Sequence, residues 1–369
     1  MSTSTLTESK KDEKNPLQEP KKESVFNVNK VAHTLDKLGL GFFTPFVRLA
    51  AGDEPEKQIR QIVISIVLPI VAIGGFMALW TFAADKVKTD SMKIPSPSET
   101  WSAWKGIHEF AVTEDKKAVD FKGRMEKLAL KAEGKGDTEK AAKYRAREYV
   151  GPPTFYTQVW ISLFTVAVGF FAATFIAVPI GIMCGLSKYV NIALNPLIQI
   201  FKPVSPLAWL PIVFVFVTAL YTPAEGEQLL TRALFISAGT VTLCSLWPTL
   251  INTAFGVAGI DKDHLNVAKV LKLSWWQRIW KIVLPASLPL MFTGLRLSLG
   301  VGWMVLVAAD MLAQNPGLGK FVWDTFQNGS TESMAQIVCA VFWIGAIGFV
   351  LDRIMFVLQK LVSFEEQAI

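Results

Sequence analysis

Long uncharged runs constrain this chain more than any other feature of its sequence. Residues 155–187 contain no Asp, Glu, Lys or Arg, and residues 61–84 and 333–351 are uncharged as well. A helix needs about 20 apolar residues to cross the hydrocarbon core of a bilayer. Residues 151–362 hold 20 charged side chains in 212 positions, about 9%, far below the roughly 25% of a soluble domain. The sequence therefore excludes a soluble enzyme, a disordered chain and a disulfide-stabilised secreted module.

We predict an all-α, polytopic membrane protein with six transmembrane helices and a helical insertion outside the membrane. The predicted spans are 61–84, 155–187, 203–224 entered through 193–202, 233–260, 284–312 and 333–362. Pro203, Pro206 and Pro211 interrupt the third span. A membrane helix tolerates such breaks where neighbouring helices satisfy the freed backbone groups.

The charges of the loops predict the orientation. The loop between the fourth and fifth spans holds five Lys or Arg residues against two Asp residues, and basic loops stay on the cytoplasmic side. Both termini are then cytoplasmic. The predicted N-terminal tail is 1–60, in which Val31–Val47 could form an interfacial helix, and the first span follows it. An extracytoplasmic segment, 85–154, comes next and contains a helical hairpin at 118–132 and 138–149. The five-helix core is 155–362, and the C-terminus is 363–369.

The cytoplasmic loop 258–285 carries the most informative pattern. Asp261 or Asp263 can cap a helix. After this first helix, an apolar stripe follows at helical spacing, which is typical of a helix lying in the membrane interface. Its residues are Trp275, Trp276, Ile279, Trp280 and Val283. The pattern predicts two short helices that a soluble partner on the cytoplasmic side can move.

This loop resembles the coupling loop of ABC importer permeases. The family consensus runs Glu-Ala-Ala, three residues, Gly, nine residues, Ile-x-Leu-Pro. Its spacing is matched by Asn266-Val267-Ala268, Lys272 and Ile282-x-Leu284-Pro285, although Asn266, Val267 and Lys272 replace Glu, Ala and Gly. The resemblance implies a set of residues that couple to a partner ATPase, in which Ala268 is small because a tight protein cleft closes on it. The set is Asn266, Val267, Ala268, Lys269, Leu271, Lys272 and Pro285.

Further motifs follow in the order of one branch of that family, the permeases for nitrate, bicarbonate, sulfonates and taurine. They are Ile94–Ser98, Lys202–Pro211, Trp247–Thr253, Thr293–Arg296 and Gly317–Gly319. Those at 202–211 and 247–257 look most like the nitrate and bicarbonate members. The resemblance covers roughly 155–360, and it implies a fold of the binding-protein-dependent permease type in the bacterial inner membrane.

The same resemblance implies the function and the partners. The cargo is a small inorganic anion, nitrate or nitrite first, imported by alternating access. The partners are a second permease copy in a homodimer, cytoplasmic ABC ATPase subunits and an extracytoplasmic solute-binding protein, within the lipid bilayer and without nucleic acid. Bicarbonate, or taurine and other sulfonates, remain alternative cargoes. An ATP-independent channel or a membrane scaffold is the alternative of another class.

The chain lacks sequence patterns for chemistry of its own. A phosphate-binding Gly-x-x-x-x-Gly-Lys-Ser/Thr loop does not occur, so we expect ATP and Mg to bind a separate ATPase chain. The three His residues are far apart in the sequence, and Cys184, Cys244 and Cys339 each lie alone in an apolar run. We therefore predict no catalytic residue, no metal site and no cofactor on this chain.

The fifth span has two faces. Gly294, Ser298 and Gly302 repeat every fourth residue, the pattern that lets membrane helices approach closely. The other face carries Arg296, Trp303 and Asp310, which are candidates for the translocation pathway.

Two interpretations of the charge in this span stay open. Arg296 lies about 16 Å beyond Pro285 at 1.5 Å per residue, and Asp310 lies about 21 Å further on, too far away to pair with Arg296. Asp352 has a similar depth on the sixth span, so Arg296 and Asp352 can form a structural pair. Alternatively, Arg296 supplies positive potential to an anion pathway. Lys202 has the same two options, with snorkelling at the inner membrane boundary as its structural role.

Overall fold

The computed structural model describes residues 43–52, 55–87, 93–221 and 229–365, together with positions 31 and 35. The chain divides into two units, Met1–Val67 and Leu68–Ile369. In the first unit, the described helices are α2 (Thr44–Ala50), α3 (Pro55–Ile62) and the π-helical segment η2 (Val63–Val67). Most of the expected interfacial stretch Val31–Val47 and of both predicted cytoplasmic ends lies outside the described residues.

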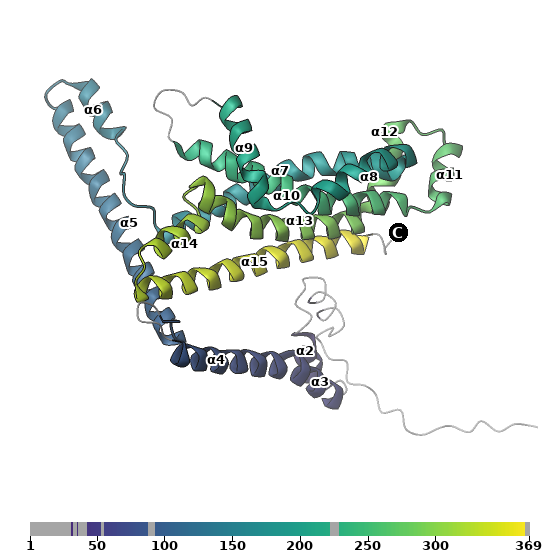
Figure 1. The fold of residues 1–369 in the computed structure, drawn as a ribbon, viewed down its shortest axis with the longest axis horizontal. Helices are drawn as coiled ribbons and strands as arrows, with labels where there is room; N and C mark the ends of the chain where they lie inside the picture. The colour runs from purple at the N-terminus through teal and green to yellow at the C-terminus, as the bar shows by residue number, and fades with distance from the viewer. Residues whose placement is uncertain are drawn as a thin grey trace, which may run out of the picture. The chain divides into compact units, whose positions relative to one another are not determined.

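The second unit is helical (Figure 1). Its elements in chain order are α4 (Leu68–Lys86), α5 (Pro97–Glu133), α6 (Thr138–Arg145), α7 (Phe155–Leu186), α8 (Lys188–Phe201), α9 (Pro206–Leu220), α10 (Leu229–Ala258), α11 (Lys262–Val270), α12 (Trp275–Arg278), η3 (Ile279–Val283), α13 (Leu284–Ala313), α14 (Leu318–Gln327) and α15 (Thr331–Glu365).

Five of the predicted spans correspond to helices that are long and apolar enough to cross a membrane. They are Pro55–Lys86, Phe155–Leu186, Arg232–Ala258, Trp275–Ala313 and Glu332–Val362. The chain is therefore a polytopic helical membrane protein, as the sequence predicts.

The third predicted span, 203–224, is not a single straight helix. Its place is taken by α8 and α9, which meet at an angle of 105° and together form a broken span or a re-entrant loop. Lys202 ends α8, and Ser205 caps α9, which has Pro206 in its first turn. Proline lacks the backbone N–H that would continue the preceding helix and favours the start of a new one. With 15 residues, α9 is about 22 Å long, too short to cross the roughly 30 Å core alone.

Helices α7, α10 and α13 form the core of the second unit, with α10 packed against both of the others (Figure 1). Glycines permit this close approach. A Cβ atom at Gly169 of α7 would lie 2.8 Å from the Ala238 carbonyl oxygen, and one at Gly294 of α13 would lie 2.9 Å from the Pro248 carbonyl oxygen. Neither backbone can move aside without separating the helices.

The small residues of α13 therefore face α10, which confirms the close-packing prediction for Gly294, Ser298 and Gly302. The Ser298 hydroxyl lies 2.7 Å from the Thr249 hydroxyl and accepts the Thr249 backbone N–H at 3.0 Å. It also donates to the Ser245 carbonyl oxygen at 2.5 Å. The α10–α13 contact is thus held by hydrogen bonds as well as by close packing.

The insertion is a helical hairpin, but its first helix is much longer than predicted. Helix α5 begins at Pro97 rather than near residue 118, because Ser96 and Glu99 form a reciprocal capping box ahead of it. The Ser-x-x-Glu spacing is a start signal in the sequence. Helix α6 ends at Arg145, four residues before the predicted end.

We predict opposite effects for two glycines of α13. Gly294→Ala should lower stability by about 1 to 3 kcal/mol, because the added methyl group overpacks the contact with α10. Gly300→Ala should leave stability unchanged or raise it by up to about 1 kcal/mol, since alanine favours helix and a Cβ there meets nothing within 4 Å. Melting temperatures in detergent test this pair. Equal loss in both variants would contradict the assigned α10–α13 contact.

Candidate functional site

The loop between α10 and α13 has a defined conformation. At the start of α11, the Asp261 carboxylate accepts a hydrogen bond from the Asp263 N–H at 3.1 Å. After α11, the Leu273 N–H donates to the Ala268 carbonyl oxygen at 3.0 Å. Lys272 has a φ of 45°, in the left-handed region. Glycine adopts this region without steric penalty, so the structure explains why the family consensus has glycine where this chain has Lys272.

Ala268 is already buried by other residues of this chain. Its side chain is only 2% exposed in the isolated chain, so its small size serves packing within the loop. The neighbouring Val270 and Leu271 are 81% and 62% exposed. Asn266 is also exposed, whereas the side chains of Val267 and Lys269 lie outside the described set.

The tryptophan stripe divides into two parts. Ile279 and Val283 are buried, and Val283 packs in a cluster with residues of α7 and α10. Trp275, Trp276 and Trp280 are between 56% and 65% exposed. The predicted interfacial helix is thus only the first turns of a continuous helical segment, Trp275–Ala313.

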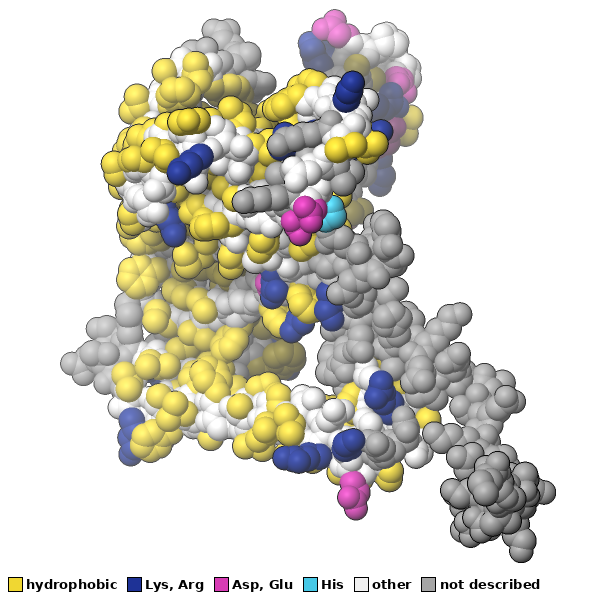
Figure 2. Space-filling model, turned by 90° about the vertical axis from the view of Figure 1, so that its right-hand side faces the viewer, with side chains coloured by type: hydrophobic (Ala, Val, Ile, Leu, Met, Phe, Trp, Pro, Cys, Tyr) yellow, Lys and Arg dark blue, Asp and Glu magenta, His cyan; other side chains and the backbone are white. Residues whose placement is uncertain are grey.

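This segment contains the π-helical turn η3, which ends just before Pro285. The missing N–H of proline and the clash of its ring with the preceding turn favour such a widened turn. Figure 2 looks onto the end of the molecule that carries α11 and α12, where hydrophobic side chains predominate and charged ones are scattered.

Arg296 and Asp352 form a bidentate ion pair between α13 and α15. Arg296 Nε lies 2.6 Å from Asp352 Oδ1, and Nη2 lies 2.7 Å from Oδ2. The guanidinium also lies over the Phe356 ring, 5.1 Å from its centroid. The side chains are 34% and 42% exposed in the isolated chain, so an adjacent subunit, water or lipid meets this pair.

The other pathway candidates lie in different surroundings. Trp303 is 6% exposed, and its indole N–H donates to the Ile344 carbonyl oxygen at 3.0 Å. These contacts give it a packing role between α13 and α15. Lys202 is exposed at the C-terminal end of α8, where a cation interacts favourably with the helix dipole.

Asp310 belongs to a buried polar cluster that spacing alone did not reveal. Its carboxylate accepts the Ser162 hydroxyl and the Asn315 amide, each at 2.8 Å. Ser162 in turn accepts the Leu318 N–H at 2.8 Å. Asp310, Ser162 and Asn315 are at most 1% exposed. The cluster joins α7, the end of α13 and the start of α14, and the glycines of Gly317-Leu-Gly319 permit the close approach.

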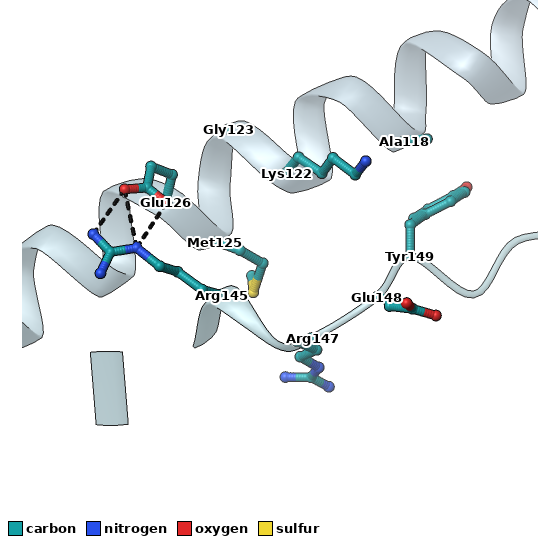
Figure 3. A pocket seen from close by; sticks show the side chains of 9 residues that line it. All are labelled: Ala118, Lys122, Gly123, Met125, Glu126, Arg145, Arg147, Glu148 and Tyr149. Carbon is teal, nitrogen blue, oxygen red and sulfur yellow. Dashed lines mark hydrogen bonds and ion pairs between the residues drawn. The ribbon is translucent and has the colours of Figure 1, made fainter. Parts of the chain in front are cut away.

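The hairpin of α5 and α6 carries an open groove of about 840 Å³ lined by charged side chains (Figure 3). Arg145 bonds to Glu126 at 2.9 Å, and this carboxylate raises the pKa of the guanidinium. Beside the groove, the Tyr149 hydroxyl donates to buried Glu114 at 2.9 Å. The hydrogen bond from Lys117 has the largest effect on Glu114 and lowers the pKa of its carboxyl group. The hydrogen bond from Tyr149 lowers this pKa as well. These bonds fix the chain that returns from α6 onto α5.

Comparison with known proteins identifies the family. Residues 177–364 match the binding-protein-dependent transport system inner membrane component. The chain is 39% identical to the nitrate import permease protein NrtB of Synechocystis sp. over 210 residues, which are 57% of this chain and 70% of that protein. It is 32% identical to the bicarbonate transport system permease protein CmpB of Synechococcus elongatus over 305 residues, which are 82% of this chain and 92% of that protein.

Among solved structures, the fold is similar to that of a chain of the MetNI methionine ABC transporter in inward-facing conformations. The match covers 56% of this chain and 95% of that chain, with a TM-score of 0.45 and 14% sequence identity. The chain belongs to the family of binding-protein-dependent inner membrane components and is a permease subunit of an ABC importer.

We predict that Arg296→Gln and Asp352→Asn each lower the melting temperature in detergent. Either change strands a charge within the membrane, which is unfavourable by about 2.5 to 3.5 kcal/mol at the bilayer centre. The double variant should regain stability, because the desolvation penalty leaves with both charges.

Reconstituted uptake then separates the two roles of Arg296. Restored stability with full uptake leaves Arg296 as structure, whereas restored stability with lost uptake places it on the pathway. A double variant whose loss of stability equals the sum of the two single losses would show that Arg296 and Asp352 do not stabilise the fold as a pair.

Proposed function

We propose that this permease imports a small inorganic anion, with nitrate as the first candidate. The similarity to a nitrate import permease at 39% identity supports this cargo, together with the matching motifs at 202–211 and 247–257. Bicarbonate is the second candidate, because a bicarbonate transport system permease protein is similar over 82% of this chain. Taurine and other sulfonates follow, from the resemblance to the wider branch.

The ATPase-coupling site of this proposal is the loop 258–285. The observation that carries it is the exposed apolar surface that this loop presents at the end of the bundle. Val270, Leu271 and Trp276 are each more than 60% exposed, while Ala268 is buried and Val283 packs against α7 and α10. An exposed apolar patch on a well-ordered loop is typical of a protein-binding surface.

The proposed assembly contains this permease and separate ATPase subunits. Without a phosphate-binding loop in its sequence, it depends on separate cytoplasmic ATPase subunits that hold ATP and Mg. Two permease copies enclose the pathway as a homodimer in the bacterial inner membrane, with both termini in the cytoplasm. ATP binding moves the 258–285 loops and opens the pathway outward.

A solute-binding protein delivers the anion on the outer side. The charged groove of the α5–α6 hairpin is its proposed docking surface, because charged and polar side chains of both signs line it. Opposite charges across an interface steer and orient an incoming partner. The alternative of an ATP-independent channel loses its support with membership of the ABC importer family.

We predict that Leu271→Asp reduces co-purification of the ATPase by more than about tenfold, because a charge placed in an apolar contact costs at least 1.4 kcal/mol. Leu271 is a cleaner probe than Ala268, since Ala268→Arg would disturb the packing of the loop itself. Val119→Asp is the matched control, because Val119 is 69% exposed on the outer hairpin. Unimpaired ATPase binding by the Leu271 variant would refute the coupling assignment.

A reconstituted system decides the cargo. Proteoliposomes that contain the permease, its ATPase and the cognate binding protein should accumulate labelled nitrate only with ATP. Unlabelled nitrate should compete, while bicarbonate and taurine at equal concentration should not. Competition by bicarbonate or taurine instead of nitrate would replace nitrate as the cargo and leave the permease assignment intact.

A further inference from the structure

A second cavity lies at the end of the bundle opposite the coupling loop. It has a volume of about 470 Å³ and lies between α9, α10, the end of α13 and α14. Figure 1 shows α14 at one end of α13 and α11 and α12 at the other. The residues that line the cavity are Phe214, Arg232, Ala233, Ile236, Ala313, Gln314, Pro316 and Lys320. Its wall is mostly apolar, with two cations and one amide.

Arg232 is the distinctive residue of this cavity. Its Nη2 donates to the Thr218 hydroxyl, and its guanidinium lies over the Phe214 ring, 5.5 Å from the centroid. These two contacts with α9 orient the guanidinium without neutralising it. Among the residues that the structure describes, no carboxylate pairs with Arg232, and its Nε has no hydrogen-bond partner. An ionised, half-buried guanidinium in this position favours an anion.

Lys320 adds a second cation with a different role. Its ammonium donates to the Gln314 side-chain oxygen at 2.9 Å and lies 3.0 Å from the Asp324 carboxylate. Asp324 therefore balances Lys320, and among the described residues of the cavity wall Arg232 carries the positive charge that no carboxylate balances. The buried carboxylate of Asp310 is not part of the cavity wall, and its oxygens bond to Ser162 and Asn315.

The chemistry of the cavity selects a small oxyanion. Because Nε of Arg232 is buried and Nη2 donates to Thr218, the remaining N–H groups of the guanidinium are the ones that can donate to the oxygens of an anion. The volume suits a small ligand with several waters and lies near the lower end of the range for ligand pockets.

We propose that this cavity is a binding site for a small oxyanion at the outer mouth of the permease, with Arg232 as its main anion-binding residue. The inference deepens the proposed function and rests on it, because the anionic cargo and the outward position of this end follow from that proposal. The site would receive the anion after its release from the binding protein and before it enters the pathway.

The test uses the complete permease–ATPase complex in nanodiscs without the binding protein. Sodium nitrate is titrated against sodium gluconate at constant ionic strength, and the melting temperature is recorded, since a ligand that binds the folded state raises it. Wild-type protein should show a saturable rise. Arg232→Gln should weaken nitrate binding by at least about tenfold, the factor expected for one charge-assisted hydrogen-bonding group.

Two further variants separate binding from structure. Arg232→Lys keeps the charge but loses the planar fork, so its affinity should be intermediate. Lys188→Gln removes an exposed cation at the start of α8, far from the cavity wall, and should bind nitrate like wild type. If Arg232 serves only to tie α10 to α9, Arg232→Gln will lower the melting temperature without anion and leave nitrate affinity unchanged, which overturns the proposal.

The same titration with bicarbonate and with taurine distinguishes the site from the cargo. Arg232-dependent binding of bicarbonate or of the taurine sulfonate, without nitrate binding, would keep the site and replace the proposed cargo. Absence of saturable binding of all three ligands to the wild-type complex would overturn the site, even if reconstituted uptake of nitrate succeeds.

Discussion

The contact of α10 with its two neighbours is the constraint on which the rest of the structure depends. In a bilayer, no hydrophobic effect drives apolar helices together, so association relies on close packing and hydrogen bonds. Helix α10 meets both requirements at once: glycines of α7 and α13 bring the backbones together, and the hydroxyls of Ser298 and Thr249 join within the contact. The two ends of α13 are thereby held in a fixed relation to α7 and α10.

Helix α13 carries a different kind of site at each end. At one end it continues back through η3 into the loop 258–285, the proposed coupling loop, and Val283 is completely buried at that junction. At the other end, the Asp310 cluster fastens α13 to α7 and to α14. A displacement of the loop would therefore reach a helix that is hydrogen-bonded at its far end. The π-helical turn is the place where this segment departs from regular α-helical geometry.

The sequence predicted the features that the bilayer enforces and missed those that depend on long-range contacts. Uncharged runs identified five spans, because a membrane-spanning helix has few alternatives. Pro203 and Pro206 are compatible with a kink or with a full break, and the structure has a bend of 105° between α8 and α9. The capping box of Ser96 and Glu99 was readable and extends α5 by about 20 residues beyond the predicted start.

The candidate site shows the same division. The exposure of Leu271 and of the tryptophans follows from their place in a short loop. The smallness of Ala268, however, fits an internal contact as well as an external one, and spacing cannot choose between them. Asp310 and Ser162 are 148 residues apart in the sequence, so no local pattern joins them. Arg232 directly precedes the predicted fourth span, and no local pattern singles it out, because its cavity is formed by four separate helices.

The placement of the cations is consistent with a pathway for a weakly held anion. A conducted ion must bind well enough to enter and weakly enough to leave. Deep in the span, Asp352 lies at hydrogen-bonding distance from Arg296, and Arg353, the next residue, adds a cation that lies over the Phe349 and Phe356 rings. Arg232, which pairs with no carboxylate among the described residues, lies instead at the proposed outer mouth. On the proposed function, a singly charged anion would meet a cation where it enters and cations that are only partly balanced at the depth of Arg296.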